Sequence, residues 1–320
     1  LYSNDMWPFH AEYPDSYPDL MLYDYDKPIE ILTDQSELTM ELTRKSISFI
    51  EKNKDNPFFL YLAHPQPHVP LFASSKFKGR SDHGLYTDVI EEIDHSLGLI
   101  METLKKNNLD KNTVVVFTSD NGPWLSYGGH AGSTGIYREG KGTTWEGGQR
   151  VPCIVWYPNE IKPNSVIKTP LMGIDWLPTF AKITNASLSE NKIDGKNIWE
   201  NLTGKTDSDP HEALFFYYHK NSLHGVRYGD YKMYFPHRYR TLNGRTGRDD
   251  GSPIKYEYVN LLENELYNLK TDPSETINII NEFPVIAKKI IALADSKRKE
   301  IGDDLTNVIG IENREVGMID

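Results

Sequence analysis

The sequence has a single cysteine, Cys153, among its 320 residues, so no disulfide can form within the chain. Long hydrophobic runs are absent as well: the longest, such as residues 114–117, are far too short to cross a bilayer. Basic residues are in the minority, with 35 Lys and Arg against 46 Asp and Glu and a formal charge of −11. This balance argues against a general nucleic-acid-binding surface.

The N-terminus also lacks the features of a natural start. Residues 1–8 contain no initiator methionine, no basic segment and no apolar segment, so they do not form a signal peptide. We therefore expect the chain to begin within a longer sequence, without a targeting signal of its own. Hydrophobic residues make up 38% of the chain. A domain of this length buries on the order of three quarters of its unfolded surface, so it needs neither disulfides nor a structural metal.

Hydrophobic spacing predicts helices and buried strands in the N-terminal part of the chain. Apolar residues at helical spacing predict three helices, at 35–53, 85–104 and 175–183. Continuous apolar runs predict three buried strands of the parallel type, at 58–63, 113–118 and 151–156. Residues 34–37 have the form of a capping box for the first helix. Residues 1–33 show no period and hold four prolines, which predicts an extended loop.

The pattern changes near residue 200. Strands are expected at 213–218 and 225–235, followed by a basic loop at 236–256 and a helix at 283–301. Helices and parallel strands thus give way to a small antiparallel sheet closed by a helix. We expect two domains, an α/β domain over residues 1–200 and a smaller α+β domain over residues 201–320.

Polar residues follow two of the predicted strands at the point where each strand ends. Strand, helix and strand in this order imply a right-handed crossover, with ligands gathering at the C-terminal strand ends. Asp120 and Asn121 offer oxygen ligands that suit calcium or magnesium, although Asp-Asn-Gly is also a common turn sequence. His64 and His68 follow the other strand, where a histidine can bind an anion, protonate a leaving group or simply belong to a loop.

A glycine-rich segment at 140–148 holds Lys141. The glycines let the backbone and the ammonium approach an anion closely, but the spacing is not that of a nucleotide-binding P-loop. An ordinary flexible loop is the alternative. Five further basic residues flank His237, and a solvated basic loop explains them more simply than an anion site does; they are Lys232, Arg238, Arg240, Arg245 and Arg248.

Taken together, these segments resemble the arylsulfatase family of the alkaline-phosphatase-like superfamily. The matching segments agree in order and spacing and cover nearly the whole chain; they lie at 57–70, 117–123, 140–148, 175–179 and 266–275. The resemblance implies an α/β fold with a mixed, mostly parallel sheet flanked by helices, from which N-terminal strands are missing. It also implies a small C-terminal antiparallel sheet with a helix.

The resemblance implies a role for each residue that matches a family motif. Asp120 and Asn121 look like half of a calcium site, for which Mg²⁺ is also possible. Lys141 resembles the lysine that binds the sulfate and its bridging oxygen. His68 resembles the histidine that hydrogen-bonds the sulfate and helps to protonate the departing alcohol. A sulfate monoester needs such positive charge and such an acid for cleavage.

The remaining family features are the substrate-side histidines and the nucleophile. We expect His64, His130 and His237 on the substrate side. The family's nucleophile is a formylglycine made from a Cys/Ser-x-Pro-x-Arg motif, which does not occur in this sequence. Cys153 lies outside such a motif and in a predicted buried strand, so it is no substitute. The nucleophile, an aspartate pair and a Lys-x-His motif are expected upstream of Leu1.

The resemblance therefore predicts a sulfuric ester hydrolase acting on a sulfated small molecule or glycan, outside the cytoplasm. This chain alone is expected to be inactive and to bind calcium weakly. A phosphodiesterase or phosphonate hydrolase of the same superfamily is one alternative, and a noncatalytic carbohydrate- or anion-binding protein on a sulfatase scaffold is another. The residues upstream of Leu1 would distinguish these possibilities.

Overall fold

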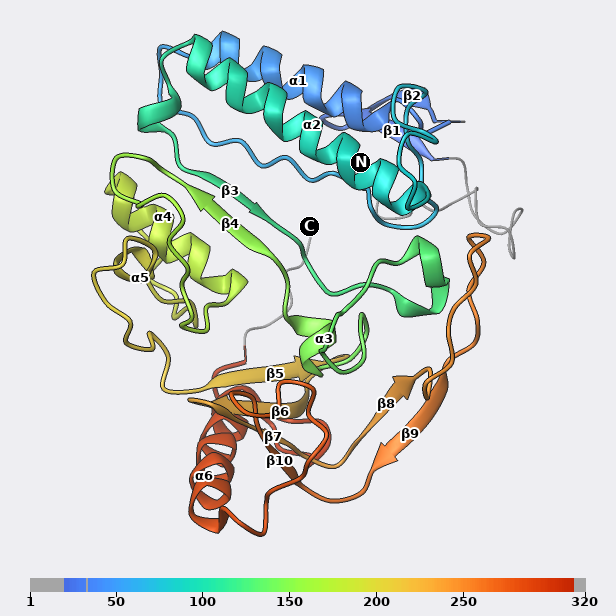
Figure 1. Cartoon of the computed structure of the whole chain (residues 1–320). Helices are drawn as coiled ribbons and strands as arrows, with labels where there is room; N and C mark the ends of the chain where they lie inside the picture. Colours follow the sequence, from blue (N-terminus) through green and yellow to red (C-terminus); the bar gives the residue numbers. More distant parts are fainter. Residues whose placement is uncertain (1–19, 33, 314–320) are drawn as a thin grey trace. The chain divides into compact units, whose positions relative to one another are not determined.

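The computed structural model describes residues 20–32 and 34–313 (Figure 1). These residues form two compact units. Within the described ranges, the first unit comprises residues 20–114, 123–133 and 242–257, and the second comprises residues 115–122, 134–241 and 258–313. The expected domain boundary at residue 200 stays a prediction.

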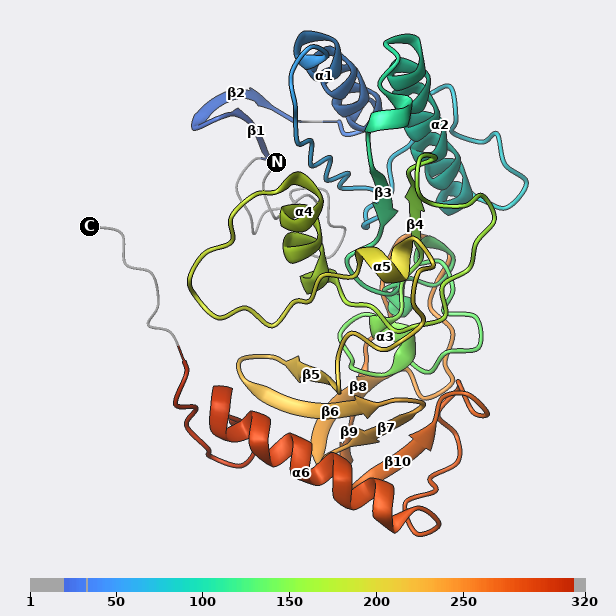
Figure 2. The ribbon, with the colours of Figure 1, turned by 90° about the vertical axis from the view of Figure 1, so that its left-hand side faces the viewer.

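Two long helices dominate the first unit, and both were predicted. Helix α1 (Leu38–Asn53) packs against α2 (Leu85–Lys106), as the two views of Figures 1 and 2 show. The apolar stripe of α2 is buried, including Val89 and Leu104. The predicted capping box at 34–37 is wrong. The Asp34 carboxylate instead accepts hydrogen bonds from the Ser36 amide and hydroxyl, at 2.9 and 2.7 Å.

The structure corrects the expected loop at residues 1–33. Strands β1 (Met21–Asp24) and β2 (Lys27–Ile31) form an antiparallel hairpin. Leu20 and Leu32, at the two ends of this hairpin, are buried with Leu38 of α1. Residues 1–19 lie outside the described residues.

The predicted strand at 58–63 is not a strand in the structure. Its residues are extended, and alternate side chains are exposed, including Phe59 (72%) and Tyr61 (81%). This alternation has the period of a strand. Among the described residues, however, no strand pairs with it, so the backbone ladder that defines a strand is missing.

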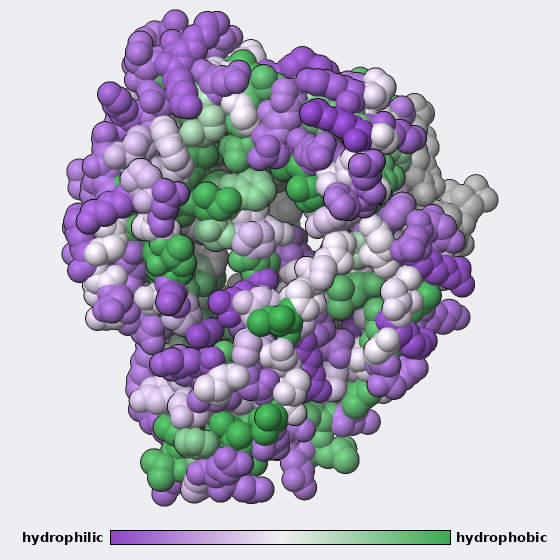
Figure 3. All heavy atoms as spheres, viewed as in Figure 1, coloured by the Kyte–Doolittle hydropathy of each residue, from purple (hydrophilic) through white to green (hydrophobic). Residues whose placement is uncertain are grey.

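The second unit contains β3 (Val115–Thr118) and β4 (Cys153–Trp156), which correspond to the other two predicted strands. They pair with each other in antiparallel register, with Val115 opposite Trp156, and not in the expected parallel arrangement. Cys153 was expected to be buried but is exposed, as is its neighbour Ile154 (63%). Neighbouring residues of a strand point to opposite faces, so this end of β4 is exposed on both faces within the described residues. Figure 3 shows hydrophobic groups at several places on an otherwise hydrophilic surface.

Helices and turns connect these strands to the rest of the second unit. The predicted helix at 175–183 is confirmed as η3 (Gly173–Asp175) and α4 (Trp176–Thr184). The remaining short helices lie in connecting segments; they are η1 (Asp110–Asn112) and η2 (Leu125–His130) in the first unit, and α3 (Glu146–Gln149) and α5 (Trp199–Leu202) in the second.

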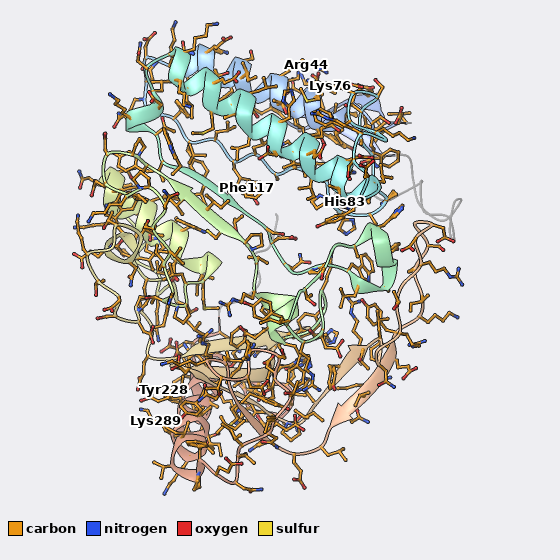
Figure 4. All side chains as sticks on the ribbon, in the orientation of Figure 1. Arg44, Lys76, His83, Phe117, Tyr228 and Lys289 are labelled. Carbon is orange, nitrogen blue, oxygen red and sulfur yellow. The ribbon has the colours of Figure 1, made fainter. Side chains whose placement is uncertain are left out.

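The small C-terminal antiparallel sheet and its helix are confirmed. The sheet has the strand order β10-β7-β6-β5, made of β5 (Leu214–Tyr218), β6 (Ser222–Tyr228), β7 (Tyr231–Tyr234) and β10 (Glu265–Asn268). Helix α6 (Pro284–Ile301) lies along the sheet and buries Ile290 and Ala294 against it (Figure 2). At the edge of this contact, Lys289 of α6 lies 5.7 Å from the Tyr228 ring (Figure 4).

Two predictions in this region need correction. The single strand expected at 225–235 is two strands, because the chain turns at Gly229 and Asp230. The loop expected at 236–256 begins with strand β8 (His237–Thr241), which pairs with β9 (Glu257–Leu261).

Each helix of the described part of the chain is too short or too polar to cross a membrane.

Candidate functional site

The turn after β3 is held against the glycine-rich loop. Strand β3 ends at Thr118, and the next residues form the turn with Asp120 and Asn121. The Gly122 amide donates to the Gly148 carbonyl at 3.0 Å. A Cβ on Gly122 would lie 1.9 Å from the Gly147 carbonyl oxygen, so only glycine fits there. We call this the turn–loop contact, defined by Gly122, Gly147 and Gly148.

The glycine-rich loop at 140–148 is tightly hydrogen-bonded to itself. The Gly147 amide donates to the Arg138 carbonyl at 2.9 Å, and the Thr143 hydroxyl donates to the Gly140 carbonyl at 2.9 Å. The Gln149 side-chain amide donates to the Thr143 carbonyl at 2.8 Å. Residues 143–148 are buried. These bonds argue against an ordinary flexible loop.

The turn–loop contact brings Asp120, Asn121 and Lys141 onto two peptide segments that touch. Asp120 is exposed, and Asn121 and Lys141 are half-buried, so a ligand can reach them. A carboxylate and an amide oxygen on one open turn are a donor set that fits a hard cation such as calcium. They would supply only part of a coordination shell, and the described residues contain no group of three His, Cys, Asp or Glu side chains that could hold a metal.

His68 belongs to the first unit, in a loop that is anchored at both ends. The Gln66 side chain donates to the Pro70 carbonyl and accepts from the Phe72 amide, each at 3.3 Å. His68 Nδ1 lies 2.7 Å from the Val69 carbonyl oxygen. A carbonyl oxygen can only accept, so Nδ1 carries the hydrogen of this contact.

His64 contacts helix α2 at a side chain that is bonded in turn to α1. Its Nε2 lies 3.2 Å from the Ser96 hydroxyl of α2, and this hydroxyl lies 2.6 Å from the Thr43 hydroxyl of α1. Burial lowers the pKa of His64, which favours the neutral imidazole. This contact anchors the loop that carries His68. The expected substrate-side role of His64 stays a prediction.

The other two histidines lie in different units. His130 is the last residue of η2 in the first unit. It lies next to Gly251, where an added Cβ would be 3.2 Å from the His130 ring. His237 is buried in the second unit, with Nδ1 2.6 Å from the Phe235 carbonyl oxygen. Its ring stacks on that of His224 at 3.9 Å. Their expected roles on the substrate side stay predictions.

The basic side chains of the region do not converge on one anion. Arg240 donates to the Lys141 carbonyl, Arg245 donates to the Leu242 and Lys255 carbonyls, and Arg238 lies 4.4 Å from the Tyr258 ring. Their partners are mostly carbonyls and rings of the chain itself. This distribution favours a structural role for the basic residues.

Lys232 is fully buried and was not recognised as a structural residue from the sequence. Its ammonium donates to the Thr144 carbonyl at 2.8 Å and to the Glu146 carboxylate at 2.7 Å. Burial raises the pKa of Glu146, but the positive charges of Lys232, Arg227 and Arg150, with the hydrogen bond from Lys232, together hold it below its ordinary value. The sequence does contain one indication of this role. Lys232 is a single charged residue within an apolar strand, and a charge in such a place needs a buried partner.

Family models match most of the chain. One, described as sulfatase, matches residues 4–186, and another, described as the C-terminal region of aryl-sulfatase, matches residues 209–314. The chain belongs to the sulfatase family. Rat steryl-sulfatase is 40% identical to this sulfatase chain over 191 residues, which is 58% of the chain and 33% of the relative. Human arylsulfatase A is 34% identical over 236 residues, which is 72% of the chain and 45% of the relative.

A solved structure supports the same assignment. A Bacteroides thetaiotaomicron protein, described in connection with the metabolism of multiple glycosaminoglycans, has a TM-score of 0.72 and 30% identity. The match covers 84% of the sulfatase chain and 56% of that protein. The chain therefore has the alkaline-phosphatase-like sulfatase fold and spans about a third to a half of the length of the two curated relatives.

Proposed function

We propose that the protein hydrolyses sulfate monoesters of aryl or carbohydrate alcohols. The turn–loop contact carries this proposal, because it joins the two potential cation ligands to the segment with the sulfate-binding lysine. Family membership supports the reaction type, and the names of the relatives favour a sulfated small molecule or glycan as substrate. By the same family resemblance, we propose a location outside the cytoplasm.

Asp120 and Asn121 would hold the calcium ion that the family resemblance implies, with Mg²⁺ as an alternative. When bound, this ion supplies positive charge that polarises the sulfate oxygens. Lys141 would supply a second positive charge, as a point donor to a sulfate oxygen and to the bridging oxygen. The buried hydrogen bonds of the loop hold its backbone in place before substrate binds, which makes such a charge more effective.

His68 would act as the acid at the leaving oxygen. Its Nδ1 hydrogen is engaged by the Val69 carbonyl, so Nε2 is the atom that can deliver a proton to the departing alcohol. The expected formylglycine nucleophile is not supplied by this chain, because the sequence has no Cys/Ser-x-Pro-x-Arg motif.

The proposal is tested with the natural full-length protein that contains these 320 residues, assayed with calcium on a chromogenic aryl sulfate and a sulfated disaccharide. The variant Lys141→Ala is expected to lower kcat/KM by about 10²- to 10³-fold, the usual effect of losing one such electrostatic contact. Lys205→Ala, which removes an exposed lysine paired with Glu160, serves as the matched control and is expected to behave like wild type.

The isolated chain is expected to show no turnover above the Lys141→Ala background. Faster cleavage of aryl phosphates or phosphonates than of sulfates by the full-length protein would contradict the proposal. Full activity of Lys141→Ala would contradict the role of the lysine.

A further inference from the structure

Arg240 of β8 holds the backbone of Lys141. The Arg240 guanidinium donates from Nε to the Lys141 carbonyl oxygen at 3.0 Å and donates to the same oxygen from Nη2. The planar guanidinium of arginine is suited to such paired donation, which a lysine ammonium cannot reproduce. The contact therefore fixes the plane of the peptide bond between Lys141 and Gly142.

Gly142 makes this approach possible. Its φ of +89° is one that side chains rarely adopt, and a Cβ there would lie 2.3 Å from the Arg240 guanidinium. The residue after Arg240 adds a second contact, because the Thr241 hydroxyl donates to the Glu139 carboxylate at 2.7 Å. Strand β8 thus contacts the loop on both sides of Lys141.

Strand β7 holds the next part of the loop. The Lys232 ammonium donates to the Thr144 carbonyl oxygen at 2.8 Å, and the Tyr234 hydroxyl oxygen lies 3.1 Å from the same atom. These side chains are buried, so their bonds are protected from competing water. Between residues 139 and 144, the path of the loop is therefore set by side chains of the C-terminal strands.

We propose that Arg240 is a positioning residue for Lys141: by binding the Lys141 carbonyl, it directs the Lys141 ammonium toward the sulfate. This inference rests on the proposed sulfatase function and deepens it, because Arg240 acts through Lys141. A displacement of about 1 Å in a reacting group can lower a rate on the order of 100-fold. The loss of Arg240 should therefore slow the reaction without preventing substrate binding.

The test compares Arg240→Ala and Arg240→Lys with wild type in the full-length protein. Both variants are expected to lower kcat about 10- to 100-fold, with KM changed less than about threefold. Added guanidinium ion is expected to restore part of the activity of Arg240→Ala but not of wild type. Arg238→Ala is the matched control, since Arg238 is exposed on the same strand and lies against the Tyr258 ring.

Hydrogen–deuterium exchange gives a readout that does not depend on catalysis. Peptides covering residues 139–144 should exchange faster in Arg240→Ala and Arg240→Lys than in wild type and in Arg238→Ala. Unchanged exchange with unchanged kcat in a folded Arg240 variant would overturn the positioning role, as would equal effects of Arg238→Ala. If wild type hydrolyses no sulfate ester, the proposed function fails, and exchange alone then decides whether Arg240 orders the loop.

Discussion

The Lys232 ammonium lies between two buried carboxylates, 2.7 Å from Glu146 and 3.9 Å from Glu275. The Tyr234 hydroxyl donates to Glu275 at 2.5 Å, and a second Glu275 oxygen accepts from the Glu146 amide at 2.9 Å. Burial removes water from the Glu275 carboxyl group and thereby raises its pKa. The cluster therefore depends on Lys232 for charge compensation.

Replacing Lys232 with Met should destabilise the protein by about 3–5 kcal/mol, because buried carboxylates are left without their partner. The measurement is the midpoint of urea unfolding, followed by circular dichroism. Lys289→Met is the control: Lys289 pairs with Glu212 at 2.7 Å on the surface, and its loss should leave the midpoint nearly unchanged. Equal midpoints for the two variants would contradict the structural role of Lys232.

The stacked pair of His224 and His237 is a second buried titratable group. His224 is 3% exposed and His237 is 5% exposed, and neither His224 Nδ1 nor His237 Nε2 has a hydrogen-bond partner among the described residues. Burial, together with the nearby His237 ring, lowers the pKa of His224 to about 3. Burial also lowers the pKa of His237. Both rings are therefore neutral in the folded protein near pH 7.

The lowered pKa of His224 predicts that the free energy of unfolding decreases as the pH falls. The unfolded chain protonates its histidines near pH 6.5, whereas folded His224 stays neutral down to about 3. The stabilising contribution is complete above pH 6.5 and declines by up to about 1.4 kcal/mol per pH unit below it.

The variant His224→Phe, which preserves ring stacking, measures this contribution. Its urea midpoint should fall less between about pH 7.5 and 5.5 than that of wild type, because one buried histidine no longer resists protonation. The control is His83→Gln, which replaces an exposed histidine and should follow wild type. An equal fall in His224→Phe and wild type would contradict the role of His224.

Single residues differ in how far the sequence predicts their role. Asp120, Asn121 and Lys141 could be selected because each lies in a short motif after or near a predicted strand. The contacts of Lys232 and Arg240 could not be predicted, because Glu146 and Lys141 lie 86 and 99 residues away in the chain. A buried ammonium and an exposed one look the same in the sequence, since only the folded partner distinguishes them.

At the scale of secondary-structure elements, close packing in the turn–loop contact requires a glycine at position 122. The Cβ of an alanine at position 122 would lie 1.9 Å from the Gly147 carbonyl oxygen, well inside any allowed contact. The turn must then separate from the loop or the backbone must shift. Either change would also move Asp120 relative to Lys141.

Gly122→Ala should therefore lower stability by about 1–3 kcal/mol and reduce sulfate hydrolysis. Urea unfolding and the aryl sulfate assay measure the two effects. Gly98→Ala is the control, because a Cβ at Gly98 of α2 meets no atom within 4 Å. In a helix interior this change should stabilise by about 0.5–1 kcal/mol. A Gly122→Ala protein as stable and active as wild type would show that the contact is dispensable.

Helices were predicted better than strand pairing. The stripe of α2 is local in the sequence and was predicted to within two residues of its observed ends. The pairing of β3 with β4 depends on a partner more than 30 residues away, and the parallel arrangement expected for it was wrong. Strand β8 was missed because its polar residues, such as Arg238 and Arg240, do not form an apolar run.

For the molecule as a whole, family resemblance was more informative than composition. The two family models together match residues 4–186 and 209–314, which agrees with a resemblance over nearly the whole chain. Composition and charge excluded classes of protein but identified no chemistry. The small C-terminal sheet was predicted, yet the contacts that hold the Lys141 loop became clear only from side chains of its strand β7 and of the separate strand β8.

The turn–loop contact also bears on which parts of the chain can change without disturbing it. The chain leaves the contact at Gly122 and returns to it through Arg138, whose carbonyl accepts from Gly147 at 2.9 Å. The residues in between form an excursion whose two ends are tied to one point. Part of this segment is fixed by packing as well, because Ser126 and Tyr127 are buried and the Ser126 carbonyl accepts from the Ile254 amide at 3.0 Å. New residues should therefore be tolerated in this segment at exposed positions such as Ile136 (62%), without moving the turn–loop contact.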